Sequence, residues 1–308
     1  MLTVLITGAS GFIGGHVTRE GARRGLDLRL LTHSRPPAVA VPGARTVRAD
    51  LADPGSLRGI CDGADVLLHC ASRIGGAPEA NEAVNARGTA ALLAEARRAG
   101  VPRVVYLSTA SVYGRGTFRG ERPERVPRNP GSPTSLNRAA AEDAVIAAGG
   151  TVLRPHLVYG EGDTWVVPGA LRILRALPGT VEGWPALLSA VSVADLARLL
   201  LGAALAPAPD LTASVYHAAH PAPVTAGAFL RAVAAAAGLP WPDRDLTLAQ
   251  ARAALAGHGQ SPHGLEMLTT DHWFDSAQLW ADLRTDPGPG FDGSGLAPGP
   301  GGSSETTA

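Results

Sequence analysis

The stretch T-G-A-S-G-F-I-G, residues Thr7 to Gly14, joins a short apolar run to the first helical pattern of the chain. In such a turn Gly8 permits the sharp change of direction, Gly11 lets a phosphate approach the backbone, and Gly14 allows the helix to pack closely on the strand. The amino terminus of the helix then offers amide donors and a positive dipole to that phosphate. The octet therefore predicts a dinucleotide-binding turn that also includes Ser10, Phe12 and Ile13.

Alternating strand and helix patterns continue from this octet toward the carboxyl terminus. Short apolar runs typical of buried strands lie at residues 2–6, 28–32, 46–49, 66–71, 104–108 and 151–154. Helical patterns, such as those at 12–24 and 83–99, separate them. This alternation predicts an α/β fold, a Rossmann-like doubly wound parallel sheet with helices on both faces.

Strand signals become sparse after residue 160, where short helical patterns lie at 168–177, 193–205 and 226–238. We therefore expect a dinucleotide-binding domain over residues 1–160, to which some later segments return. Residues 161–285 would form a smaller, mostly helical substrate-binding region at the carboxyl ends of the strands, where open α/β sheets bind ligands. The run from 286 to 308 is rich in Gly, Pro and Ser, which predicts a disordered tail.

The composition argues against several classes of function. The chain has 308 residues, is 45% hydrophobic and carries a formal net charge of zero, so no basic field attracts nucleic acid or anionic lipid. Its first residues lack a basic export segment, and no stretch has the roughly 18 to 20 apolar residues that span a bilayer. Cys61 and Cys70 offer neither a disulfide framework nor a metal spacing. We expect a cytoplasmic protein with no metal, no membrane partner and no nucleic-acid partner.

Six further stretches follow the octet in order: A-D-L-A-D (49–53), H-C-A-S (69–72), V-N-A-R-G-T (84–89), L-S-T-A-S-V-Y-G (107–114), L-R-P-H-L-V-Y-G-E-G-D (153–163) and V-S-V-A-D-L-A (191–197). Together with T-G-x-x-G-x-x-G they resemble the extended short-chain dehydrogenase/reductase family, the relatives of nucleotide-sugar epimerases and dehydratases. The resemblance covers nearly everything before the tail. It implies a bound nicotinamide dinucleotide, and it leaves a monomer and a homodimer equally open.

The resemblance also implies which residues surround the dinucleotide. They are Asp50 and Leu51 at the adenine, Ala71 and Ser72 along the cofactor channel, and Pro155, His156 and Leu157 beside the nicotinamide. Structural alternatives stay open, such as a helix cap for Asp50 or simple packing for Ala71 and Pro155.

The end of the second strand predicts which dinucleotide binds. NAD-binding relatives have an acid there that accepts from the adenosine ribose hydroxyls. Thr32 stands at this position, and His33, Ser34 and Arg35 follow it. An acid would repel a 2′-phosphate, whereas a guanidinium would hold it. We therefore expect NADPH with Arg35 as the principal clamp, the alternative being a solvated loop arginine.

The usual proton donor of the family is missing. Members that reduce or oxidise a carbon–oxygen bond use a Ser or Thr after the fifth strand and a Tyr-x-x-x-Lys pair on the next helix. Thr109 matches the first residue, but Thr134 stands at the Tyr position and Arg138 at the Lys position. An aliphatic hydroxyl is a far weaker acid than a phenol, and Arg does not deprotonate usefully, although both still donate hydrogen bonds. Since a positioned general acid contributes roughly 10² to 10⁴ in rate, another source is needed.

Few groups of the protein could replace that acid. The chain contains no Lys, and its four phenols are Tyr106, Tyr113, Tyr159 and Tyr216. Tyr106 lies inside a predicted strand, while Tyr113 and Tyr159 belong to V-Y-G turns that relatives also possess, so structural roles are favoured over proton donation for them. His156 could protonate near neutral pH, but a lone His is more often structural.

A second source of the proton is the substrate itself. A phenol next to a ketone on a fused aromatic ring can pass its proton to the new alkoxide, and the phenolate that remains is delocalised. The chain is similar in kind to atypical angucyclinone ketoreductases of antibiotic pathways, such as those of simocyclinone type, which implies an NADPH-dependent ketoreductase of an aromatic polyketide. Thr109, Ser111, Thr134 and Arg138 would then surround the reacting atoms, and substrate contacts are expected from Ser72, Arg73, Ser111, Tyr113, Trp165 and Val166.

Two other functions stay open. A non-catalytic NADP-sensing protein would keep the same motifs and act on a partner protein. A nucleotide-sugar epimerase would need the Tyr acid and usually NAD, and few charged residues near Trp165 would grip a diphosphate. Trp165, Val166, Val167 and Trp184 indicate either an apolar substrate pocket or ordinary core.

Overall fold

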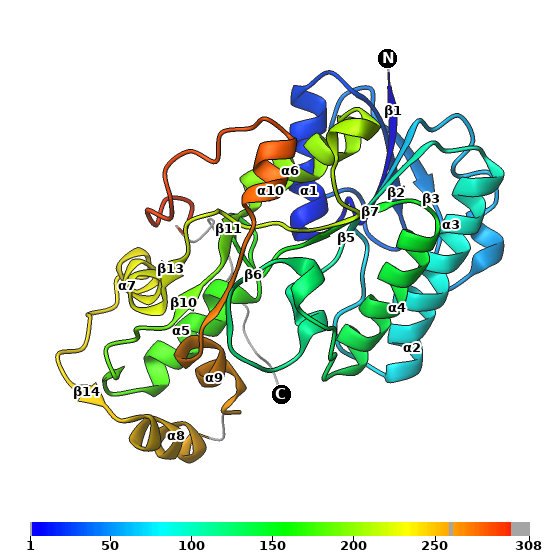
Figure 1. The fold of residues 1–308 in the computed structure, drawn as a ribbon. Helices are drawn as coiled ribbons and strands as arrows, with labels where there is room; N and C mark the ends of the chain where they lie inside the picture. The colour runs from blue at the N-terminus through cyan, green and yellow to red at the C-terminus, as the bar shows by residue number, and fades with distance from the viewer. Residues whose placement is uncertain (1, 259–260, 297–308) are drawn as a thin grey trace.

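Seven parallel strands form the central sheet, in the order β12-β7-β5-β4-β1-β2-β3 (Figure 1). The computed structural model describes residues 2–258 and 261–296. The sheet strands are β1 (Thr3–Thr7), β2 (Asp27–Thr32), β3 (Arg45–Arg48), β4 (Val66–His69), β5 (Arg103–Leu107), β7 (Thr151–Arg154) and β12 (Val215–His217). The predicted Rossmann-like α/β fold is confirmed, because the strand order reverses beside β1 as in doubly wound sheets. All six predicted strands are present; β12 was not expected.

In the central strand β1, apolar residues do not alternate with polar ones, because both faces of the strand are buried. All five of its residues are buried, since helices cover both faces of the sheet. Val4 and Ile6 enter the core cluster that includes residues of α1 and α6, whereas Leu5 enters the cluster on the opposite face. A strand that feeds two cores reads as a continuous hydrophobic run, which is the pattern that identifies it in the sequence.

Helices lie on both faces of this sheet (Figure 1). On one face α1 (Phe12–Arg23) packs against α6 (Val193–Leu205), and α10 (Ala277–Asp282) lies near them. On the other face lie α2 (Pro78–Glu82), α3 (Thr89–Arg98) and α4 (Pro133–Ala147). A π-helical turn at Ala83–Gly88 joins α2 to α3, so the helix expected at 83–99 is one continuous run with a widened first part.

The second region contains short strands as well as helices. A four-stranded sheet has the order β13-β10-β15-β6, and two further pairs are β11 with β8 and β14 with β9. Strands of two to four residues carry too little periodicity to be recognised in the sequence. The elements are β6 (Phe118–Glu121), β8 (Leu157–Tyr159), α5 (Val166–Ala176), β9 (Thr180–Val181), β10 (Leu187–Leu188), β11 (Ala190–Ser192), β13 (Val224–Thr225), α7 (Ala226–Ala236), β14 (Asp245–Leu246), α8 (Leu248–Gly257), α9 (His263–Thr269) and β15 (His272–Phe274).

The prediction of a disordered tail is wrong over residues 286–296. Leu296 is 4% exposed, and Phe291 packs edge-on against Tyr159 and lies 5.4 Å from the ring of Phe229. Two apolar side chains thus anchor a Gly- and Pro-rich segment to the second core, an effect that composition alone does not reveal. The remainder of the expected tail, 297–308, lies outside the described residues.

Membrane-spanning helices and metal clusters are both absent from residues 2–258 and 261–296. No helix there combines the length and the apolar character needed to cross a bilayer. The same residues contain no cluster of three or more His, Cys, Asp or Glu side chains arranged to hold a metal ion.

Candidate functional site

The glycine-rich turn forms a close-fitting cradle between β1 and α1. Gly8 has a φ of +75°, and a Cβ there would lie 2.7 Å from the backbone nitrogen of Ala71. A Cβ on Gly14 would overlap the carbonyl oxygen of Gly8. Gly11 begins α1 with no side chain bonded to the amides of the first turn. Those amides and the missing side chains fit a pyrophosphate, so this turn is the place where the chain would hold a dinucleotide.

A buried hydrogen-bond chain fixes the opposite wall of the cradle. Thr89 donates to the carbonyl of Asn85 (2.6 Å), so its oxygen accepts from Nε2 of His69 (2.9 Å). Nδ1 of His69 must then accept from the hydroxyl of Thr7 (2.6 Å), whose oxygen accepts in turn from the amide of Ala71 (3.0 Å). Burial lowers the pKa of His69 to about 3, so the imidazole stays neutral near pH 7, with its proton on Nε2. These hydrogen bonds hold Ala71 at the position where the family resemblance predicts the cofactor channel.

The loop that follows β2 lies against the cradle. Thr32 ends β2 with 7% exposure, and the amide of Ala38 donates to the carbonyl of Ala9 (2.9 Å). Residues 33–38 therefore run beside the phosphate turn, with Arg35 exposed. Arg48, at the end of β3, lies directly opposite Thr32 in register and is also exposed, a position that no sequence motif marked. Neither guanidinium has an ion pair among the described residues.

Asp50 and Leu51, the residues expected at the adenine, both make contacts within the protein. One carboxylate oxygen of Asp50 accepts from the amide of Ala52 (2.9 Å), and the other lies 3.4 Å from Nε2 of His33. Leu51 is 6% exposed and packs in the core.

The loops after β5 and β7 meet at the centre of the sheet edge. The amide of Ala110 donates to the carbonyl of Pro155 (2.8 Å). Thr109 caps the turn that follows β5, because its oxygen accepts from the amide of Ser111 (3.1 Å) while its hydroxyl donates to the Ser111 hydroxyl (3.2 Å). Ser111 is exposed, so the pair presents a hydroxyl beside the residues expected along the nicotinamide.

Thr134, in the first turn of α4, is tied to a cluster of amide side chains. Its oxygen accepts from Nδ2 of Asn81 (2.9 Å) and, over a longer distance, from the amide of Gly75 (3.4 Å). Asn81 and Asn85 both donate to the carbonyl of Arg73 (2.9 and 2.8 Å). The cluster thereby holds the loop after β4, which carries Ser72 and Arg73, next to Thr134. Sequence reasoning missed Asn81, because a single Asn in a helix has no motif of its own.

Arg138 is a buried cation without a carboxylate partner among the described residues. Its side chain is 6% exposed and donates to the carbonyl of Leu107, and its guanidinium carbon lies 5.1 Å from the ring centre of Tyr106. Its Nε atom is buried and has no hydrogen-bond partner in the described part of the chain. A positive charge therefore remains at the position where the family has Lys.

None of the four tyrosines offers a phenol to a reaction at this edge. Their exposed fractions range from 1% to 7%, and burial raises the pKa of each, to about 12 for Tyr159 and Tyr216. Tyr113 accepts from Arg154 (2.7 Å) and bonds Nε2 of His217 (2.6 Å). The prediction that Tyr113 contacts substrate is wrong, because its ring and its hydroxyl are both enclosed.

His156 is not suited to act as a charged acid. Burial, followed by the neighbouring imidazoles, lowers its pKa to about 3, so it is neutral near pH 7. Its ring stacks on His272 with centres 5.5 Å apart, and its buried Nε2 has no partner within the described residues.

Acid should destabilise the fold through its buried histidines. Burial lowers the pKa of His69, His156 and His217 to about 3, whereas the unfolded chain has ordinary values of about 6.5. The unfolded state therefore binds more protons, and stability that is complete above about pH 6.5 is lost as the pH falls toward 3. Urea unfolding between pH 6 and 5 should show uptake of about three protons, or about 4 kcal/mol per pH unit. A slope of one proton or less would contradict this.

The segment after β8 connects the second region to α1. A Cβ on Gly162 would contact the Phe12 ring (3.4 Å), which places this segment at the cradle. The Asp163 carboxylate accepts from the amides of Trp165, Val166 and Val167 (2.8, 3.0 and 2.7 Å) and fixes the start of α5. Trp165 is 59% exposed, so it presents a flat apolar face; Trp184, by contrast, is 1% exposed and is ordinary core.

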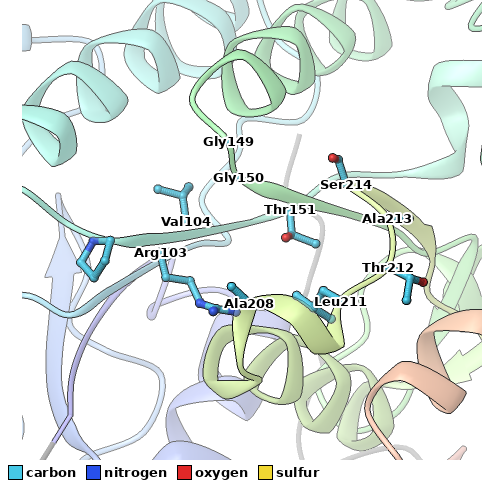
Figure 2. Close-up of a pocket in the computed structure, with 11 residues that line it drawn as sticks. Arg103, Val104, Gly149, Gly150, Thr151, Ala208, Leu211, Thr212, Ala213 and Ser214 are labelled. Carbon is cyan, nitrogen blue, oxygen red and sulfur yellow. The ribbon is translucent and has the colours of Figure 1, made fainter.

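Cavities are also found outside the glycine-rich cradle. One of about 280 Å³ is lined by Arg103, Val104, Thr151 and residues 211–214 (Figure 2). These residues mark the amino ends of β5, β7 and β12, opposite to the edge that carries the cradle. A second cavity of about 450 Å³ lies between α2 and α4. It is lined by Pro78 of α2 and by Pro133, Leu136 and Asn137, which lie near Thr134 along α4. We assign the site from the cradle and the strand ends, since ligands bind at the carboxyl edge of such sheets.

Known proteins resemble this chain in sequence and in fold. The model of the NAD dependent epimerase/dehydratase family matches residues 4–217. A 2-alkyl-3-oxoalkanoate reductase of Stenotrophomonas maltophilia is 28% identical over 305 residues, 89% of this chain and 91% of that protein. A 4-hydroxy-2-methyl-3-oxo-4-farnesyl-3,4-dihydroquinoline-1-oxide ketoreductase of Stigmatella aurantiaca is 29% identical over 268 residues, 82% and 78% of the two chains. The solved UDP-glucose 4-epimerase of Thermus thermophilus in complex with NAD shares the fold, with a TM-score of 0.72, 24% identity and 96% of each chain covered.

Proposed function

The chain belongs to the NAD dependent epimerase/dehydratase family and is an NAD(P)-dependent oxidoreductase, and on that premise we propose that it is an NADPH-dependent ketoreductase of a fused-ring aromatic polyketide, as in angucyclinone antibiotic biosynthesis. The ketone would lie beside a phenol of the same substrate, and that phenol would supply the proton. The observation that carries this proposal is the lack of an available phenol or ammonium at the sheet edge: Thr134 and Arg138 occupy the acid positions, and all four tyrosines are buried.

NADPH, when bound, supplies a hydride to the carbonyl carbon. The new alkoxide takes the proton of the neighbouring phenol, which becomes a phenolate and later regains a proton from solvent. The tasks of the protein are to align the ring and to stabilise the negative charge. Thr109 and Ser111 offer hydroxyls at the end of β5, the buried Arg138 contributes positive charge, and Trp165 offers a flat apolar surface.

The named relatives support the direction of the reaction and the kind of ketone. Both the Stenotrophomonas and the Stigmatella proteins are reductases of 3-oxo compounds, and the name of the Stigmatella protein places its oxo group on a fused ring system. The experiment is to mix the protein and NADPH with a panel of hydroxylated fused-ring ketones and to identify the alcohol formed. Tight binding of NADPH with no oxidation by any such ketone would instead favour a non-catalytic NADP-sensing protein.

Preference for NADPH should depend on Arg35. Arg35→Ala removes a guanidinium that would form charged hydrogen bonds to the 2′-phosphate, so the Kd for NADPH should rise about 10-fold to 100-fold. The Kd for NADH, which lacks that phosphate, should change little. Both constants can be measured by fluorescence titration.

Two further variants sharpen that test. Arg48→Ala should weaken NADPH binding less than Arg35→Ala does, since Arg48 sits on the neighbouring strand. Arg252→Ala, on the exposed side of α8, is the matched control and should leave both constants unchanged. Tighter binding of NADH than of NADPH by the unaltered protein would refute the cofactor assignment.

A further inference from the structure

The Asn81 side chain has an orientation that the backbone determines. The amide of Arg73 can only donate, and it donates to Oδ1 of Asn85 (2.8 Å). Nδ2 of Asn85 therefore faces Asn81 and donates to its Oδ1 (2.9 Å). That oxygen also accepts from Asn137 (3.1 Å). Nδ2 of Asn81 is left to face the Arg73 carbonyl and the hydroxyl oxygen of Thr134.

The consequence for Thr134 is a matter of hydrogen-bond capacity. A hydroxyl has one proton and two acceptor positions. The two acceptor positions of Thr134 are taken by Asn81 (2.9 Å) and Gly75 (3.4 Å), and its proton is donated to no acceptor among the described residues. Thr134 is only half-buried, whereas Asn81 is 1% exposed. The hydroxyl therefore has one capacity left, that of a donor, and its partial exposure leaves it accessible to a ligand.

We propose that Asn81 is a positioning residue that makes Thr134 a dedicated hydrogen-bond donor to the substrate oxygen that becomes negative. This inference rests on the proposed function, since it concerns the reaction at the same site. A hydroxyl that was free to rotate would present its lone pairs to an anion in part of its orientations. Fixing it as a donor in advance avoids that reorganisation at the moment when charge develops. Thr134 thus stabilises the phenolate without supplying the proton.

The pKa of a bound ligand reports this role without turnover. The probe is 1-hydroxyanthraquinone, whose phenol lies beside a ketone and whose colour changes on ionisation, bound to the protein with NADP⁺. Thr134→Val and Asn81→Leu should each raise the pKa of the bound phenol by about one unit, because the phenolate loses a hydrogen bond that favours its charged form. In the ketone assay each should lower kcat about 2-fold to 10-fold and leave the Kd for NADPH unchanged.

The double variant separates positioning from a merely structural role. If Asn81 acts through Thr134, the variant with both changes should show no larger pKa shift than the larger single one. Additive shifts, or no shift with Asn81→Leu, would overturn the proposal. Asn137→Leu is the matched control, because Asn137 donates one hydrogen bond to Asn81 and makes none to Thr134 among the described residues; it should leave the phenol pKa unchanged. If Asn81→Leu does not fold, Asn81→Ser can be used instead, because the shorter serine side chain cannot reach Thr134.

The two proposals fail separately in this design. Loss of the non-additive pattern with normal reduction of ketones by the unaltered protein would refute the role of Asn81 alone. Non-additive pKa shifts in a protein that reduces no hydroxylated ketone would refute the proposed reaction and support the Asn81–Thr134 pair.

Discussion

Methylation of the substrate hydroxyl beside the ketone is expected to lower kcat by about 10²-fold to 10⁴-fold, the usual contribution of a positioned acid. Within the described part of the chain, neither a tyrosine nor His156 can replace that proton: the four tyrosines are enclosed and burial keeps His156 neutral, while the sequence contains no Lys. Affinity should fall little, because the ring system still meets the same apolar surface. The measurements are kcat from NADPH oxidation and the ligand Kd from fluorescence quenching.

A ketone methylated on a remote hydroxyl of the same ring system is the control for bulk and solubility. It should be reduced at nearly the rate of the parent compound, because the phenol next to its ketone is intact. Normal reduction of the ketone methylated at the neighbouring hydroxyl would mean that a group of the protein donates the proton.

Replacement of Glu142 by Gln should destabilise the fold by about 3 to 5 kcal/mol, the usual result of leaving one member of a buried ion pair alone. Glu142 is 0% exposed and accepts from Arg154 twice (2.8 and 2.5 Å), from the Ser108 hydroxyl and from Arg128. Arg154, 5% exposed, would keep its charge with no carboxylate to neutralise it. Chemical denaturation at neutral pH measures the change in the free energy of unfolding.

The adjacent residue provides the matched control. Asp143 pairs with the same Arg128, but its side chain is 62% exposed, so Asp143→Asn should cost about 1 kcal/mol or less. Equal losses for the two variants would show that the buried cluster is no more important than a surface pair.

The sheet could be predicted because its signals are local. The central strands β1 and β4 are short, fully buried runs, and the turn at Gly8 to Gly14 has a backbone requirement that glycine alone meets. The strands of the second region could not be predicted, since elements such as β9 and β10 have two residues each and are held by partners far along the chain. Phe291 and Leu296 escaped notice for the same reason: their burial depends on a core built by other segments.

Site residues could be predicted where they belong to a sequence motif, but not where their role depends on hydrogen bonds between distant segments. Thr134 and Arg138 were found because they stand at the two positions of the Tyr-x-x-x-Lys pair of the family. The enclosure of Tyr113 depends on Arg154 and His217, from two other strands, and no spacing along the chain announces that contact. Asn81 likewise gains its meaning only when α2 and α4 are placed side by side.

The path of the chain between its two halves limits how the protein can be re-engineered. After β7 the chain enters the second region, comes back for α6 and β12, leaves again for α7 and α8, and returns once more at α10 (Figure 1). A chimera that borrowed the substrate half of another reductase would therefore need several grafted pieces with matched splice points. Altered ketone selectivity is better sought by substitutions around Trp165 than by exchange of whole modules.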